Sequence, residues 1–184
     1  NTIIALALMT LPPAASAARL TNEQITQLLQ DKIRVVQHMA LNPLLVKAVR
    51  RQNAQSLDAA TIEQRDREWR SSGDEGPLKR ALQSGDHAAV MRRFVDQDPA
   101  LSGALLADNQ GANVATYRLA DDYWQGDEAE WERTYNRGEG QVYVSPIQLD
   151  EKTGAASTYV AAPVLDRGAT IGVLVVGVNL GGSR

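Results

Sequence analysis

The chain has 184 residues, which suits one domain with a sizeable core and is too short for two large independent domains. Its 19 basic and 22 acidic residues are mixed along the sequence and give a formal net charge of −3. Because this balance offers no basic surface for nucleic-acid phosphates, we expect no nucleic-acid partner. The lack of cysteine excludes disulfides, thiolate nucleophiles and cysteine-based zinc sites.

The first eighteen residues have the pattern of a secretory signal peptide. An uncharged apolar run at 3–11 is followed by two prolines and by the small-residue pattern Ala15-Ser16-Ala17. The run is shorter than the roughly 20 apolar residues of a membrane-spanning helix. We therefore expect 1–18 to be a signal peptide and the mature protein to be exported to the periplasm.

Residues 19–100 are expected to form a helical region. Apolar residues recur every three or four positions between 21 and 52, which is typical of one helix face. Thr21 and Gln24 have capping-box spacing, and Asn42-Pro43 should break this long helix. Further helices are expected at 57–70, 77–83 and 86–97, with Asp58 and Asp86 as caps of the first and the last.

Residues 101–184 are expected to form an antiparallel sheet, because β-rich runs there alternate with turn sequences such as "DNQG" and "DRG". The expected strands lie at 102–108, 113–119, 141–149, 156–165 and 170–180, with one short helix at 127–135. The last strand is apolar on both faces, so it should be central, with the long helix on one side. The segment 121–131 should cover the other side and form a pocket.

The stretches "LLADNQGANVAT", "DDYWQGDEAEW", "GQVYVSPIQLDEKTG" and "YVAAPVLDRGATIGVLVVGVNL" resemble the Cache (PDC, PAS-like) extracellular sensor domains of bacteria. The resemblance is most specific at the motif D-Y-W-Q-G-D-E, and it extends over about 21–180. It implies an α+β fold: a single Cache domain in which a long N-terminal helix packs on a PAS-like five-stranded antiparallel sheet. It also implies a periplasmic sensor that binds a small polar metabolite for signal transduction, as in chemotaxis, with a membrane receptor or a kinase as partner and with no cofactor.

Two departures from this family affect the expected ligand and the architecture. Amino-acid-sensing members carry an arginine two residues before a Trp-Tyr pair and an aspartate in the last strand, whereas this chain has Ala129 before Trp131 and Asn179 in the strand. A ligand with amine or amide donors, or a neutral one, is therefore favoured, unless Arg118, Arg133 or Arg137 replaces the missing arginine. The chain also ends at "NLGGSR" without an output module, so we expect either a free-standing sensor or a piece of a longer receptor.

The expected ligand-binding residues are the polar and aromatic side chains of the 121–131 segment and the hydroxyl-bearing side chains of the strands. They are Tyr117, Asp121, Tyr123, Trp124, Gln125, Asp127, Trp131, Tyr143, Ser145 and Tyr159.

Several of these residues have a plain structural alternative. One of Tyr123 and Trp124 should belong to the core, Asp127 can be a helix cap, and Tyr143 with Ser145 can lie on an outward face. The remaining acids of the segment, Glu130 and Glu132 above all, are expected to be solvated.

Catalysis and metal binding are not expected. A nucleophile turn such as G-x-S-x-G is absent, and the two histidines, His38 and His87, are typical of surface or satisfied core positions. The six acids between 121 and 132 lack the spacing of an EF-hand, so a calcium-stabilised fold is only a third option, testable by chelation. The main competing hypothesis is an interaction or adaptor domain that forms a homodimer through its long helix and has no ligand.

Overall fold

The long N-terminal helix is interrupted at Asn42-Pro43, as expected. The computed structural model describes residues 20–73, 76–118 and 120–181, so the expected signal peptide lies outside the described residues. Helix α1 (Asn22–Ala40) starts with the capping box: the Gln24 N–H donates to the Thr21 hydroxyl (3.2 Å) and the Thr21 N–H to the Gln24 side chain (2.8 Å). Helix α2 (Pro43–Asn53) begins at the proline, and Asn42 caps it by accepting the Leu44 N–H at 3.0 Å.

Four further helices follow in the described residues, with a short 3-10 turn after the last. They are α3 (Ala59–Ser71), α4 (Pro77–Leu82), α5 (Gly85–Gln97), α6 (Ala129–Tyr135) and η1 (Asn136–Gly138). Asp58 caps α3 by accepting the Thr61 N–H at 2.7 Å, which confirms the prediction. Asp86 is not a cap, and that prediction was wrong: the chain turns earlier, so extended Ser84 is the N-cap and Asp86 lies in the first turn of α5, where a negative charge favours the helix dipole.

The strands of the described chain form one antiparallel sheet. They are β1 (Leu101–Asp108), β2 (Asn113–Tyr117), β3 (Tyr143–Val144), β4 (Gln148–Leu149), β5 (Ala156–Asp166) and β6 (Ala169–Asn179). Their order is β2-β1-β6-β5-β3, and β4 also pairs with β5. The α+β class with an N-terminal helix packed on an antiparallel sheet is therefore confirmed, and β6 is central as predicted.

The sheet has six strands instead of five because the expected strand at 141–149 is divided. The Ser145 N–H still donates to the Tyr159 carbonyl at 2.9 Å, but strand pairing with β5 resumes only at Gln148. The register shifts by one residue across this break, from Val144↔Val160 to Gln148↔Ser157. Pro146 lies in the irregular stretch between β3 and β4, at the edge of the sheet, where proline is tolerated.

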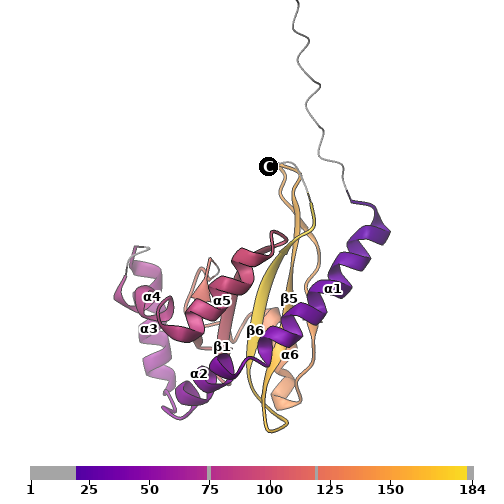
Figure 1. Ribbon diagram of the computed structural model, residues 1–184. Coiled ribbons are helices and arrows are strands. Elements are labelled where there is room, and N and C mark those ends of the chain that lie inside the picture. The colour runs from indigo at the N-terminus through magenta and orange to yellow at the C-terminus, as the bar shows by residue number, and fades with distance from the viewer. Residues whose placement is uncertain (1–19, 74–75, 119, 182–184) are drawn as a thin grey trace, which may run out of the picture.

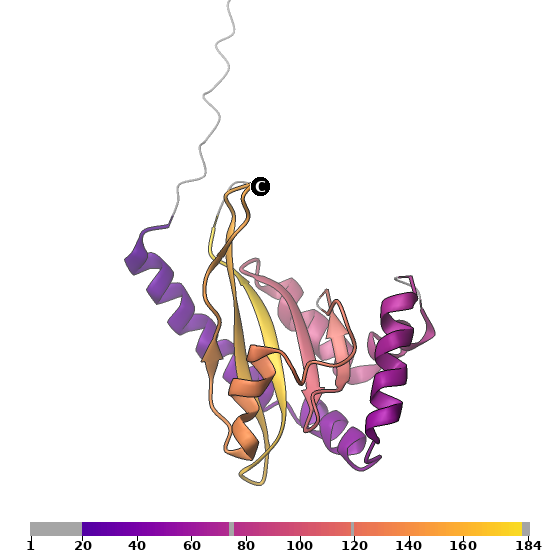
Figure 2. The same cartoon turned by 180° about the vertical axis from the view of Figure 1, so that it is seen from behind.

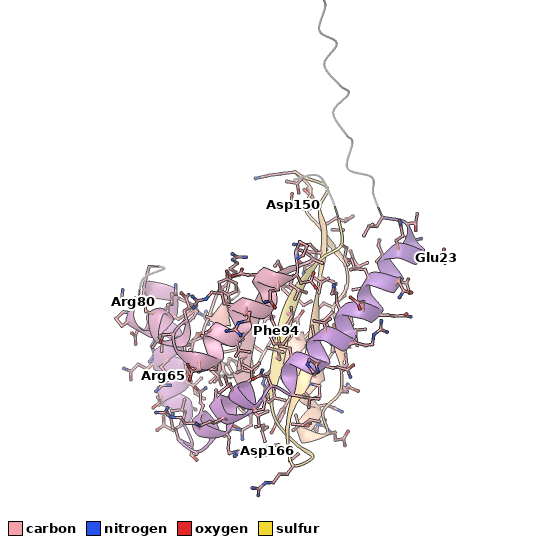
Figure 3. The ribbon with its side chains drawn as sticks, viewed as in Figure 1. Glu23, Arg65, Arg80, Phe94, Asp150 and Asp166 are labelled. Carbon is pink, nitrogen blue, oxygen red and sulfur yellow. The ribbon has the colours of Figure 1, made fainter. Side chains whose placement is uncertain are left out.

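Helices α1, α2 and α5 cover one face of the sheet (Figure 1). Their side chains join those of the strands in the main core, which contains Val36, Met39, Leu45, Val49, Met91, Val95, Leu106, Leu174 and Val176, all at most 2 % exposed. Phe94 of α5 packs partly buried against this core and is labelled in Figure 3. Among the described residues, no helix is long and apolar enough to cross a membrane.

The opposite face is covered by α6 and by the segment that leads into it (Figure 2). A smaller apolar cluster lies there, with Leu105, Ala107, Ala161, Val173 and Val175 of the sheet under Trp131, Tyr135 and Tyr159. Helices α3 and α4 lie beyond the β2 side of the sheet, as both ribbon views show. The two faces are therefore covered differently, and on the α6 side a pocket lies between the sheet and its cover.

Candidate functional site

A pocket of about 170 Å³ lies between the sheet and the 120–131 segment. Its floor comes from three neighbouring strands: Leu105 of β1 is paired with Val175 of β6, and Tyr159 of β5 lies two residues before Ala161, the other partner of Val175. Because side chains two residues apart on a strand share a face, these three side chains meet on the α6 side. The floor is thus apolar with one phenol hydroxyl.

Trp131 forms an aromatic wall of the pocket. Its ring stacks on Tyr135 of the same helix, with centroids 4.9 Å apart and planes tilted by 13°. Its indole N–H donates to the Asp108 carbonyl at 2.9 Å, at the end of β1. A stacking contact on one face and a hydrogen bond at the edge therefore fix the position of the ring.

The rest of the lining is acidic: Asp121, Asp122, Glu128 and Glu130 contribute carboxylates, together with the amide of Gln125. No lysine or arginine is among the described residues that line the pocket. Glu130 is oriented by a hydrogen bond from the Ser145 hydroxyl, and Gln125 donates to the Asp122 carboxylate at 2.6 Å. The pocket therefore presents several oriented hydrogen-bond acceptors and an excess of negative charge.

Burial, together with this excess of negative charge, raises the pKa of two of the carboxyl groups. Partial burial raises the pKa of Asp122, and the nearby charges of Asp66 and Asp127 raise it further, against the opposing effects of Arg70 and Gln125. Burial also raises the pKa of Glu128, and neighbouring carboxylates, that of Asp127 first, add to the effect. A bound cation would relieve this repulsion.

Asp66 of α3 holds the pocket segment in place. Its buried carboxylate accepts the N–H groups of Tyr123 (3.0 Å) and Trp124 (3.2 Å) and pairs with Arg70. Asp66 is not among the residues expected from the sequence, because nothing in a helix as charged as 57–70 sets one aspartate apart. Its only signal is the four-residue spacing to Arg70, which is common on solvated helices.

The two aromatic residues of the motif divide as expected, with Tyr123 in the core. Tyr123 is fully buried against Trp69, with ring centroids 6.3 Å apart, and its hydroxyl accepts a 3.0 Å hydrogen bond from Arg65. Trp124 is half-buried and donates its indole N–H to the Gln110 carbonyl at 2.8 Å. Trp124 lies outside the lining of the pocket.

Four of the ten expected ligand-binding residues line the pocket: Asp121, Gln125, Trp131 and Tyr159. The other six, Tyr117, Tyr123, Trp124, Asp127, Tyr143 and Ser145, do not. Ser145 acts on the pocket only through Glu130.

Tyr117 and Tyr143 lie against arginines outside the pocket. The Tyr117 hydroxyl donates to Asp96 at 2.8 Å, and the guanidinium of Arg118 lies 4.5 Å from the centre of its ring. Tyr143 has Arg133 over its ring at 5.2 Å. Both phenols are therefore engaged with charged side chains of the protein.

Asp127 does not cap α6, and that expectation was wrong. The Glu128 N–H donates to the Gln125 carbonyl at 3.1 Å, so Asp127 lies inside a turn and is exposed, while extended Glu128 is the N-cap. Glu130, expected to be solvated, instead faces the pocket, because it lies one turn before the buried Thr134 on the same helix face.

None of the three arginines considered as replacements lines the pocket. Arg133 lies over Tyr143, Arg137 is exposed, and Arg118 lies beside a second hollow next to the pocket. Asn179 is exposed at the end of β6. Within the described residues, no group of three or more His, Asp or Glu side chains is placed to hold a metal ion.

No protein-family model matches the sequence, and no curated protein matches it. Among solved structures, the ligand-binding domain of the Pseudomonas aeruginosa PAO1 amino-acid chemoreceptor PctC in complex with GABA is 15% identical, with a TM-score of 0.48 over 86% of this chain and 56% of that one. The sensor domain of the V. cholerae histidine kinase DctB is 19% identical, with a TM-score of 0.44 over 86% and 53%. The sensory domain of the Campylobacter jejuni chemoreceptor Tlp3 with isoleucine bound is 12% identical, with a TM-score of 0.38 over 87% and 64%.

This chain thus spans little more than half the length of the first two of these solved chains. All three are sensor or ligand-binding domains of receptors or kinases.

Proposed function

We propose that this protein is a sensor domain that binds one small, amine-bearing metabolite in the pocket between the sheet and the 120–131 segment. The observation that carries the proposal is the pocket's composition: four carboxylates surround an apolar floor that has an aromatic wall. Carboxylates and an aromatic face both favour an ammonium group, and an apolar floor suits a short carbon chain. The role is binding and signalling, without catalysis.

We assign the ligand contacts by group. Asp121, Asp122 and Glu130 accept from the amine, Gln125 and the Tyr159 hydroxyl add neutral hydrogen bonds, and Trp131 covers the carbon chain. Ser145 positions Glu130 without touching the ligand. Tyr123, Trp124 and Asp66 hold the segment that carries these groups.

A thermal-shift and calorimetry screen tests this function. Putrescine and other small primary amines, neutral polyols and simple carboxylates are added to the full chain. The amines should raise the melting temperature, and the carboxylates alone should not. The proposal is overturned if no amine raises the melting temperature or binds in calorimetry.

Two variants of α6 test whether the amine binds in this pocket. Glu130→Gln should weaken putrescine binding about tenfold, as the loss of a charge-assisted hydrogen bond does. Glu132→Gln is the matched control, because it makes the same chemical change at an exposed position outside the pocket. Equal effects of the two variants would count against this pocket.

The cellular setting extends the proposal. An exported, periplasmic location rests on the signal-peptide pattern at 1–18, and cell fractionation tests it. A membrane receptor or kinase would then be the partner that reads the bound state. The homodimer through α1 also stays a prediction; the apolar residues Ile25, Leu28 and Leu29 of that helix already pack against the core. Sedimentation at several concentrations tests it.

A further inference from the structure

A second hollow opens directly beside the acidic pocket. It has a volume of about 450 Å³ and shares Ala120, Asp121 and Tyr159 with the pocket. Its other walls include Trp69 of α3, Lys79 and Gln83 at α4, and Arg118 after β2. Both hollows are therefore bounded by Asp121 and Tyr159, and we call the two together the groove.

The charge changes sign along this groove. The pocket end carries the four carboxylates, whereas the hollow adds the ammonium of Lys79 and the guanidinium of Arg118 to the shared Asp121. Arg118 is partly neutralised by Asp96 at 3.3 Å. Lys79 has no carboxylate partner within the part of the chain that the structure describes, and there it donates to the Ser72 carbonyl at 3.1 Å. Among the described residues, the Lys79 ammonium thus makes one of the three hydrogen bonds that it can donate.

Trp69 adds a second reason to place an acceptor in this region. The Lys79 ammonium lies 5.3 Å from the centre of the Trp69 ring, which fixes its position over the indole. The Trp69 side chain is almost fully buried, and its indole N–H has no hydrogen-bond partner among the described residues. A buried donor without a partner destabilises the fold, so an acceptor placed near this wall would be favourable.

We propose that the groove binds an extended zwitterion, namely an ω-amino acid whose amine lies in the acidic pocket and whose carboxylate lies against Lys79. This inference rests on the proposed function, because it needs the amine end to occupy the pocket. An α-amino acid carries both charged groups on one carbon atom, so it cannot place one at each end of the groove. A chain of several methylene groups can, and it would run past Tyr159 at the junction.

Calorimetry with a defined set of compounds tests the proposal. The set contains 4-aminobutanoate, 5-aminopentanoate and 6-aminohexanoate, with putrescine, pentanoate and alanine as comparisons. At least one ω-amino acid should bind more tightly than all three comparison compounds. If alanine or pentanoate binds as tightly as the best ω-amino acid, the extended zwitterion is wrong.

Lys79→Met tests the carboxylate end and keeps an unbranched side chain over Trp69. It should weaken binding of the best ω-amino acid about tenfold and leave putrescine binding unchanged. Lys47→Met is the matched control, because Lys47 is exposed on α2 and should change neither affinity. Lys79→Gln is the second variant if the methionine variant folds poorly, and it should act in the same direction.

The outcomes separate this inference from the proposed function. If putrescine binding depends on Glu130 while Lys79→Met and Lys79→Gln leave ω-amino-acid binding unchanged, the amine pocket stands and the carboxylate subsite is wrong. If both Lys79 variants weaken putrescine and ω-amino acids equally, Lys79 has a structural role only and the subsite is also wrong. If no compound binds, both proposals fail.

Discussion

The indole N–H of Trp131 donates to the backbone carbonyl of Asp108, at a distance of 2.9 Å. The side chain of the same Asp108 is buried and accepts hydrogen bonds from Gln52 of α2 (2.9 Å) and from the N–H groups of Gln110 (2.8 Å) and Ala112 (2.9 Å). The aromatic wall of the pocket is therefore joined through the β1–β2 turn to a helix on the other face of the sheet. Burial raises the pKa of Asp108, and these hydrogen bonds oppose that shift.

Gln52→Leu should destabilise the protein through this buried group. The variant removes the side-chain donor to Asp108 and leaves the carboxylate with less compensation for its burial, for a loss of about 1–3 kcal/mol. Urea unfolding measures the free energy of unfolding. Gln37→Leu is the control, because Gln37 is exposed on α1 and should change stability by less than about 0.5 kcal/mol. Equal losses for the two variants would contradict the role of Gln52.

Asp66→Ala should loosen the pocket segment. The substitution leaves the N–H of the buried Tyr123 and that of Trp124 without their acceptor, which should lower the free energy of unfolding by about 2–4 kcal/mol. Hydrogen exchange should quicken at these two amides. Glu63→Ala, on an exposed face of the same helix, removes only a surface pair with Arg67 and should have little effect. Unchanged exchange at both amides would rule out this anchoring role.

Gly111→Ala should destabilise the β1–β2 turn, which lies against the motif at Gln125 and Gly126. Gly111 has a φ of +82°, and a Cβ there would lie 2.5 Å from the backbone N of Gly126. Gly138→Ala is the control: its φ is +92°, but a Cβ there meets nothing within 4 Å. Left-handed geometry alone costs about 1–2 kcal/mol, so Gly111→Ala should lose clearly more than Gly138→Ala in urea unfolding. Similar losses would show that the turn can move away from Gly126.

Sequence periodicity was enough to predict the layers of this fold. Apolar residues every three or four positions predicted the helices α1, α2 and α5. A strand that is apolar on both faces predicted the central β6. Helix caps were harder to predict. The cap at Asp58 was predicted correctly, whereas Asp86 and Asp127 are not caps. An aspartate near a helix start is also common in the preceding turn and in the first helical turn. Pro146 marks the place where the expected strand at 141–149 is divided, but the sequence prediction treated this segment as one strand.

The site was only partly predictable because it is assembled from distant segments. Asp121, Gln125 and Trp131 were expected from the motif, since they share one local segment. Lys79 and Asp66 lie on helices whose position against the motif follows from the tertiary fold alone. Glu130 was misjudged because hydrophobicity patterns do not distinguish a carboxylate that faces solvent from one that faces a polar pocket.

Gly126 illustrates the same limit at the level of the backbone. Gly126 is not among the glycines with positive φ, so its backbone angle does not require glycine. A Cβ at Gly126 would lie 2.5 Å from ring atoms of Trp124. The close contact is thus with the neighbouring indole.

The pocket carboxylates should make stability depend on pH in a defined direction. Because the folded-state pKa of Asp122 is raised above its ordinary value, the folded protein binds a proton more readily than the unfolded chain. The contribution of Asp122 to stability therefore improves as pH falls through the raised pKa toward the ordinary value, and it is least favourable at neutral pH. Asp122→Asn should remove this gain, so the difference in unfolding free energy between the variant and the wild type should favour the variant more at pH 7 than at pH 4.

Asp150 provides a control of opposite sign at the far end of β5 from Asp166 (Figure 3). Its pKa is lowered because its carboxylate accepts hydrogen bonds from Thr153 and Lys152. Its stabilising effect is present at neutral pH and is lost as pH falls through the lowered pKa, so Asp150→Asn should be more harmful at pH 7 than at low pH. Denaturation curves between pH 4 and pH 7 check the direction for Asp122, and curves extended below the ordinary pKa of Asp150 check the opposite direction for Asp150. If Asp122→Asn were less favourable relative to the wild type at pH 7 than at pH 4, the raised pKa of Asp122, and with it the electrostatic case for an amine ligand, would be wrong. An amine that pairs with Asp122 should, by the same reasoning, bind more weakly at pH 4 than at pH 7 and release protons as it binds.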